Sequence, residues 1–192
     1  MDDAVRRQAI WRAARDGDRG KLDELVFALD WGDRGHIPDA TIQLLVDALN
    51  DAEFVLSPAA DVMAEAFEQM GISVGLDVKK LSSDQHAKLM QAFEFALPLA
   101  SYQLSFHISV LLGERFHDAG ALEALRRLRT ASDAGVRERV AHALQHFAVE
   151  CVDVELRRRA HAALREMVDD NDEGTRANVV YYLDNVEQGR SF

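Results

Sequence analysis

The sequence repeats itself at an offset of 39 residues, and this repeat limits the possible folds more than any other feature. Between residues 121–147 and 160–186, nine of the 27 aligned positions are identical. The identical pairs are Ala121/Ala160, Ala124/Ala163, Leu125/Leu164, Arg126/Arg165, Asp133/Asp172, Gly135/Gly174, Arg137/Arg176, Val140/Val179 and Leu144/Leu183. A unit of this length that occurs twice predicts a stack of similar supersecondary structures.

Each copy has the pattern of two helices joined by a turn. In the second helix of the first copy, Val140, Leu144 and Phe147 recur at steps of three and four residues, which makes one apolar face. The matching first helices are expected at 121–130 and 154–168. The candidate N-caps of the second helices are Ser132 or Asp133 in the first copy and Asn171 or Asp172 in the second. A single helix pair cannot bury both of its apolar faces, so each pair must stack on a neighbour.

This pattern resembles a HEAT repeat. A Leu-rich first helix is followed by a turn that contains Asp133 and by a Val136-Arg137 pair that enters the second helix. A period of roughly 40 residues is typical of HEAT repeats, whereas ankyrin and tetratricopeptide units are shorter, at about 33 and 34 residues. The resemblance is good over residues 118–187 and only architectural before them, and the second copy has Thr175 where the family usually has Val.

The resemblance also implies a role for four residues of the two copies. In the HEAT family the turn Asp and the helix Arg commonly form a ladder between adjacent repeats. We therefore expect Asp133, Arg137, Asp172 and Arg176 to stabilise the stack and not to bind a ligand.

Upstream of residue 118, helical patterns and breaks continue to alternate with more divergence. Ser82 and Gln85 have the spacing of a capping box, and Pro98 must end or kink the helix before it. Residues 97–112 are apolar around most of a helix, so we expect that helix to be buried on several sides. Helices are expected near residues 3–15, 20–31, 39–50, 58–70, 83–97 and 100–114. The predicted fold is all-α: a HEAT-like α-α superhelix of about five stacked antiparallel helix pairs in a single domain, residues 1–192.

The cysteine content and the distribution of charged residues indicate the cellular compartment and exclude several kinds of binding site. Cys151 is the only cysteine, so the chain has neither a disulfide framework nor paired zinc-binding cysteines, and a reducing, cytoplasmic location is expected. The first residues are charged and no apolar stretch follows them, so this segment does not have the pattern of a signal peptide. Charged residues recur too often for a membrane span. We expect no cofactor and no membrane association.

The net charge of −11 is concentrated in one part of the chain. Residues 21–114 hold five basic and fifteen acidic side chains, a balance of −10, whereas residues 1–20 sum to +1 and residues 115–192 to −2. A region of one sign repels nucleic acid and anionic lipid and attracts basic proteins.

Carboxylates on the outer sides of two expected helices are the first candidate binding residues. Two interpretations are open: a solvated face, which most charge runs are, or a docking surface that speeds encounter with a basic protein. The absence of interspersed Lys or Arg favours docking, because a solubilising face gains from mixed signs. The candidates are Asp47, Asp51, Glu53, Asp61, Glu65 and Glu68, with Asp39 as a neighbour.

Phe27 and Trp31 are the second candidates. Leu22, Leu25 and Leu29 define one apolar face of their helix, and the two aromatic side chains lie roughly on its other side. Packing against a neighbouring repeat is one use of such residues, and an exposed aromatic anchor of a binding interface is the other.

The histidines raise the question of a metal site. Glu138, His142 and His146 follow one another at steps of four on one helix and can face the same way. The HExxH pattern is absent and the sequence identifies no third ligand, so a polar face is the favoured interpretation and no metal ligand is assigned.

The motifs of enzyme active sites are missing. The chain has no glycine-rich phosphate loop and no GxSxG elbow, and Cys151 has no recognisable partner histidine. The function expected is binding of a basic protein through the acidic region. Small acidic HEAT-like proteins include bacterial immunity proteins, and the resemblance of this chain to them in size and charge implies the most concrete form of this function, an immunity-type protein that neutralises a toxin. The alternatives are a glycosylase-like or other nucleic-acid binder that uses the Arg-rich segments 126–129 and 157–159, a bilin lyase, or a structural adaptor.

Overall fold

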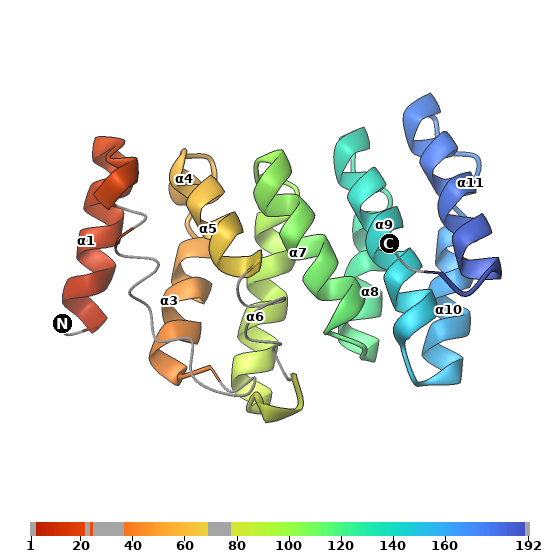
Figure 1. Cartoon of the computed structure of the whole chain (residues 1–192), viewed down its shortest axis with the longest axis horizontal. Coiled ribbons are helices and arrows are strands. Elements are labelled where there is room, and N and C mark those ends of the chain that lie inside the picture. Colours follow the sequence, from red (N-terminus) through yellow and green to blue (C-terminus); the bar gives the residue numbers. More distant parts are fainter. Residues whose placement is uncertain (1–2, 22–23, 25–36, 69–77, 191–192) are drawn as a thin grey trace. The chain divides into compact units, whose positions relative to one another are not determined.

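The computed structural model in Figure 1 describes residues 3–21, 24, 37–68 and 78–190, with some helical residues described by their backbone alone. Every regular element in these ranges is a helix, which confirms the predicted all-α class. The elements are α1 (Asp3–Asp16), α3 (Asp39–Leu49), α4 (Ala52–Val55), α5 (Ala59–Glu68), the 3-10 helix η2 (Val78–Lys80), α6 (Ser83–Ala96), α7 (Tyr102–Glu114), α8 (Ala119–Leu128), α9 (Ala134–Glu150), α10 (Val154–Arg165) and α11 (Glu173–Glu187).

The chain forms two compact units, which divide within α7. Unit 1 comprises residues 1–107 and unit 2 comprises residues 108–192. In unit 1, α3 is the central described helix, because it packs against α1, α4 and α6. Its buried residues include Leu45 and Leu49, and α6 buries Phe93.

Local sequence signals set the helix ends in unit 1. The hydroxyl of Ser82 accepts a hydrogen bond from the backbone N–H of Gln85, and the Gln85 side chain accepts one from the backbone N–H of Ser82. This confirms the predicted capping box. As expected from Pro98, α6 ends at Ala96. The four-residue helix α4 was not predicted; it begins where Asp51 accepts hydrogen bonds from two backbone N–H groups.

Unit 2 contains the two sequence copies as two helix pairs, α8 with α9 and α10 with α11. Helix α9 packs against α8, α10 and α11, and its residues Val140, Leu144 and Phe147 are fully buried, as the apolar pattern predicts. Of the alternative caps, the aspartates are the ones used. Asp133 accepts from the backbone N–H of Val136, and Asp172 accepts from that of Thr175.

Arg137 links the two copies. Its guanidinium donates to both carboxylate oxygens of Asp170, at 2.7 and 2.8 Å, and to the side-chain oxygen of Asn171 at 2.6 Å. It also donates to the backbone carbonyls of Ala131 and Ser132 at 2.9 and 3.0 Å. These five hydrogen bonds use all five guanidinium N–H groups. The structural role predicted for Arg137 is therefore present, but its carboxylate partner is Asp170, which the sequence analysis did not select.

In the part of the chain that the structure describes, no helix is both long and apolar enough to cross a bilayer. Cys151 is buried at the end of α9, and burial raises the pKa of its thiol. A buried thiol with a raised pKa is a poor nucleophile, which favours a packing role for Cys151.

Candidate functional site

The described acidic residues of α3 and α4 differ in how they are held. Asp47 is half-buried on α3, where the side-chain amide of Gln43 donates to it at 2.8 Å. Asp51 is the N-cap of α4 and accepts from the backbone N–H groups of Glu53 and Phe54. Glu53 is exposed in the first turn of α4. Asp51 therefore has a structural role in addition to its charge, whereas the Glu53 side chain is available to solvent.

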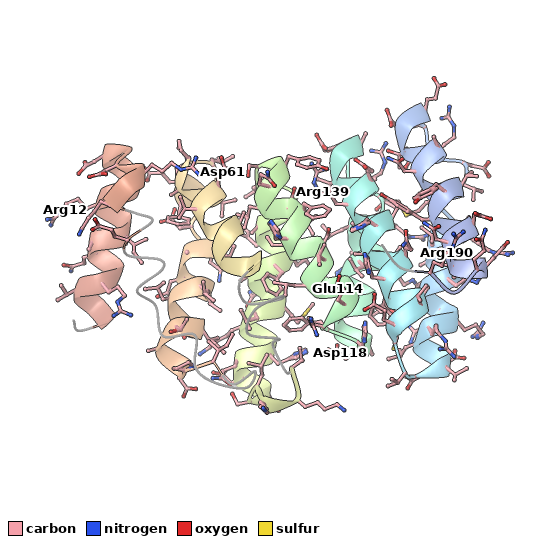
Figure 2. All side chains as sticks on the ribbon, viewed as in Figure 1. Arg12, Asp61, Glu114, Asp118, Arg139 and Arg190 are labelled. Atoms are coloured by element: carbon pink, nitrogen blue, oxygen red, sulfur yellow. The ribbon has the colours of Figure 1, made fainter. Side chains whose placement is uncertain are left out.

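Asp61 is less exposed than the sequence analysis assumed. It lies in the first turn of α5 (Figure 2), is half-buried, and accepts a hydrogen bond of 2.7 Å from the hydroxyl of Ser101. Asp39, at the start of α3, is exposed and accepts a hydrogen bond from the side-chain amide of Gln85. Both bonds come from uncharged groups, so neither cancels the negative charge of its carboxylate.

Four of the predicted binding residues are outside what the structure describes. Phe27 and Trp31 fall in the undescribed range 25–36. Glu65 and Glu68 belong to α5, but only their backbone is described. Their proposed part in binding stays a prediction.

The sequence from Gly35 to Val78, which we call the acidic segment, contains eight Asp or Glu residues and no Lys or Arg. The segment therefore supplies no cation of its own to neutralise these charges. In unit 2, by contrast, acidic and basic residues are intermixed and form many ion pairs. Those pairs include Arg126–Glu123, Arg129–Glu166, Arg158–Glu155, Arg159–Glu123 and Arg165–Glu187.

This pairing bears on the Arg-rich segments 126–129 and 157–159. A surface that binds nucleic acid must offer several cations to phosphates. Here Arg126, Arg129, Arg158 and Arg159 each have a carboxylate partner within the unit. The arginines therefore serve the internal electrostatics of the repeats.

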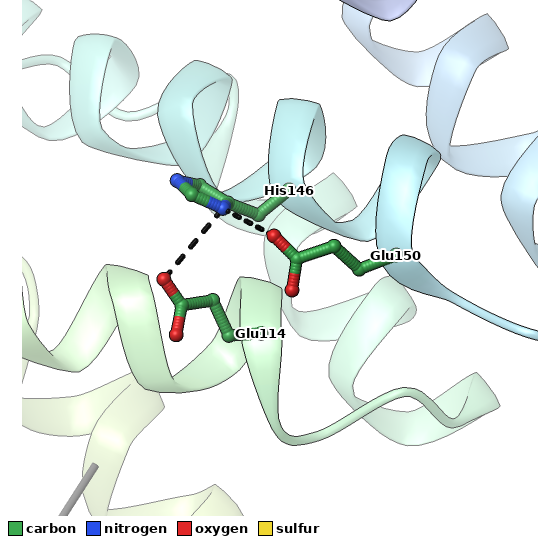
Figure 3. A group of neighbouring side chains, drawn as sticks. All are labelled: Glu114, His146 and Glu150. Atoms are coloured by element: carbon green, nitrogen blue, oxygen red, sulfur yellow. Dashed lines mark hydrogen bonds and ion pairs between the residues drawn. The ribbon is translucent and has the colours of Figure 1, made fainter. Parts of the chain in front are cut away.

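A cluster of ionisable side chains lies between α7 and α9 in unit 2 (Figure 3). The Nδ1 atom of His146 is 2.8 Å from Oε1 of Glu150 and 3.7 Å from Oε1 of Glu114. The imidazole is buried, with 5% of its side chain exposed, whereas the two carboxylates are 32% and 28% exposed. One donor atom from each residue lies within 4.8 Å of the other two. We call Glu114, His146 and Glu150 the histidine cluster.

The histidine cluster differs from the trio that the sequence suggested. Glu138 accepts a hydrogen bond of 3.0 Å from the side-chain amide of Asn178 and is not part of the cluster. His142 lies next to the cluster, with its Nε2 atom 3.3 Å from Nε2 of His146. The step of four from His146 to Glu150 was readable in the sequence. Glu114 was not, because it is on another helix.

Gly113 explains how Glu114 reaches His146. A β-carbon at position 113 would lie 2.6 Å from the backbone oxygen of Ala143 and 3.0 Å from the β-carbon of His146. Only glycine allows α7 and α9 to approach this closely. The same close approach places the next residue, Glu114, beside the buried imidazole.

A second feature of unit 2 is an open hollow of about 540 Å³ at the turns of the two copies. Arg137 and Asp170 line it, together with Arg129 and Glu166. All five N–H groups of Arg137 are already used in hydrogen bonds to the protein. The hollow therefore marks the junction between repeats, and the Arg137 guanidinium in its wall has no N–H left for a ligand.

Comparisons with known proteins assign no family. No protein-family model matches the chain, and no curated protein matches it. Among solved structures, the chain is similar to the crystal structure of an engineered protein, at 16% identity over 98% of each chain, with a TM-score of 0.29. A TM-score this low carries no argument about fold or function.

Proposed function

We propose that this protein is a HEAT-like binding module that recognises a basic protein through the acidic segment. The observation that carries the proposal is the absence of Lys and Arg from Gly35 to Val78, in a stretch with eight carboxylates. Such a field raises the rate of encounter with a basic partner and disfavours acidic ones.

The positions of the described carboxylates support this proposal. Glu53 and Asp39 are exposed, and Asp39 and Asp61 accept hydrogen bonds from neutral side chains. Neutral hydrogen-bond donors fix the orientation of a carboxylate while leaving its charge in place. A partner with Lys or Arg at matching positions would therefore meet charges that are already oriented, which lowers the entropy cost of docking.

The repeats of unit 2 fit the part of a scaffold. Several of their arginines are paired with carboxylates, and Arg137 is enclosed by acceptors from both copies. This arrangement favours protein binding over the alternative of nucleic-acid binding. The most concrete form of the proposal is an immunity-type protein that neutralises a basic toxin domain, a form that rests on likeness in size and charge.

The proposal is tested by capturing proteins from the native host with the tagged chain and identifying them by mass spectrometry. The variant carries Glu53→Lys, Glu65→Lys and Glu68→Lys, which reverse charge without removing the Asp51 cap or the Asp61–Ser101 hydrogen bond. We expect the intact chain to retain a basic protein that is released near 0.3 M salt, where the screening length is only about 5–6 Å.

A matched control carries Asp169→Lys and Glu173→Lys, two exposed carboxylates of unit 2. We expect this control to retain the basic protein and the acidic-segment variant to lose it. Equal retention by both variants, or capture of acidic proteins only, would contradict the proposal.

A further inference from the structure

We propose that Glu114, His146 and Glu150 form a binding site for one divalent transition-metal ion of the zinc class. The site is independent of the acidic segment, because all three residues belong to unit 2. It joins α7 to α9, so a bound ion would link two helices that are adjacent across Gly113.

The spacing of the donor atoms fits such an ion. Ligands bonded to zinc at about 2.0–2.2 Å in tetrahedral geometry are roughly 3.3–3.6 Å apart. The distances from His146 Nδ1 to the two carboxylate oxygens are 2.8 and 3.7 Å, on either side of this range. All three donor atoms lie within 4.8 Å of one another, so rotation of the side chains can bring them to the ligand spacing of zinc.

The negative charges of the histidine cluster also favour a bound cation. Two carboxylates that converge on one point repel each other, and both are only about a third exposed to solvent. A divalent ion that bonds to all three residues would reduce this repulsion.

His142 supplies the outer contact that a metal-bound imidazole usually has. Its Nε2 atom is 3.3 Å from Nε2 of His146, and its ring lies against Tyr182 with the ring centroids 5.6 Å apart. When Nδ1 of His146 binds a metal, the remaining ring N–H is at Nε2 and can donate to His142. Such a bond fixes the tautomer and the ring orientation of the ligand.

The donor set selects among metals. One imidazole nitrogen with two carboxylates suits zinc and its first-row neighbours, whereas calcium prefers six to eight oxygen ligands and magnesium keeps most of its water. Three protein ligands leave at least one position for water, as in open zinc sites. The partial exposure of Glu114 and Glu150 gives solvent a route to that position.

The same contacts have a metal-free interpretation, in which Nδ1–H of His146 donates to Glu150 and no ion is needed. The two states differ in the tautomer of His146, because a metal at Nδ1 moves the single ring proton of the neutral imidazole to Nε2. Saturable metal binding that depends on both carboxylates therefore distinguishes them.

The test is a calorimetric titration of the tag-free full chain with Zn²⁺. We expect one Zn²⁺ per chain and a higher melting temperature. Glu114→Gln and Glu150→Gln each keep the side-chain shape and remove a charge, and each should weaken Zn²⁺ binding at least about tenfold. Mg²⁺ at the same concentration should give no comparable heat.

Glu138→Gln is the matched control, because Glu138 is on the same helix but bonds to Asn178 outside the cluster. It should bind Zn²⁺ like the unchanged chain, and circular dichroism should show that all variants are folded. Absence of saturable Zn²⁺ binding would overturn the proposal. So would equal weakening by Glu138→Gln, or binding that survives the Glu114→Gln/Glu150→Gln double substitution.

Discussion

The repeats at residues 118–187 and the acidic segment at 35–78 use charge in opposite ways. In the repeats, several carboxylates and arginines pair with each other, and the buried pair Arg137–Asp170 connects one copy to the next. In the acidic segment, Asp61 and Asp39 take their hydrogen bonds from Ser101 and Gln85, which leaves the charge in place.

This difference separates charges that stabilise a fold from charges that are available for recognition. An ion pair inside a stack is of little use to a partner, because its groups already have the hydrogen bonds that they need. A carboxylate that is oriented by a neutral group keeps its long-range field. The comparison predicts that substitutions in the repeats change stability, whereas substitutions in the acidic segment change association.

The largest change in folding stability is expected when Arg137 is substituted. Its side chain and that of Asp170 are only 8% and 7% exposed, so Arg137→Ala leaves a buried carboxylate without its cation. We expect a loss of about 3–5 kcal/mol in the free energy of unfolding, measured by urea denaturation. The control is Arg158→Ala, which removes an exposed pair with Glu155 and should change little. Similar losses for both variants would show that burial does not distinguish the pairs.

The next largest change in folding stability is expected when the close contact between α7 and α9 is disturbed. Gly113→Ala places a methyl group 2.6 Å from the backbone oxygen of Ala143, so the helices must move apart. We expect a destabilisation of about 1–3 kcal/mol by urea denaturation. Gly20→Ala is the control, since among the described residues its added methyl would meet only Asp18, at 3.8 Å, and alanine favours helical backbone. An unchanged stability for Gly113→Ala would refute the close approach.

A smaller change in folding stability is expected when the pH is lowered. The hydrogen bond from Arg137 lowers the pKa of Asp170 in the folded chain. A depressed folded pKa gives stability that is present above the unfolded value, about 3.9, and is lost as the pH falls through the folded value. The difference in unfolding free energy between the chain and Asp170→Asn should therefore shrink below about pH 4. A difference that is constant down to pH 2 would contradict this role.

Features set by neighbours in sequence were predictable. The capping box of Ser82 with Gln85 and the caps Asp133 and Asp172 depend on residues three positions apart, and the apolar face of α9 depends on its own period. Helix α4 was missed, since four residues carry too little periodicity to detect.

Features that depend on tertiary contacts were not predictable. Asp170 aligns with Ala131 in the first copy, so the repeat itself gave no reason to choose it as the partner of Arg137. Glu114 is on α7, and only the close approach at Gly113 places it near His146. The trio of Glu138, His142 and His146, for which a polar face was the favoured interpretation, followed helical spacing alone, and Glu138 bonds to Asn178 on α11.

The central claim is that the acidic segment steers a basic partner to this protein. It is tested most directly by the association rate constant with the captured basic protein, measured by stopped flow at increasing salt. For the variant with Glu53→Lys, Glu65→Lys and Glu68→Lys, we expect association at low salt to slow at least about tenfold and its salt dependence to flatten. An association rate and salt dependence equal to those of the unchanged chain would contradict the claim.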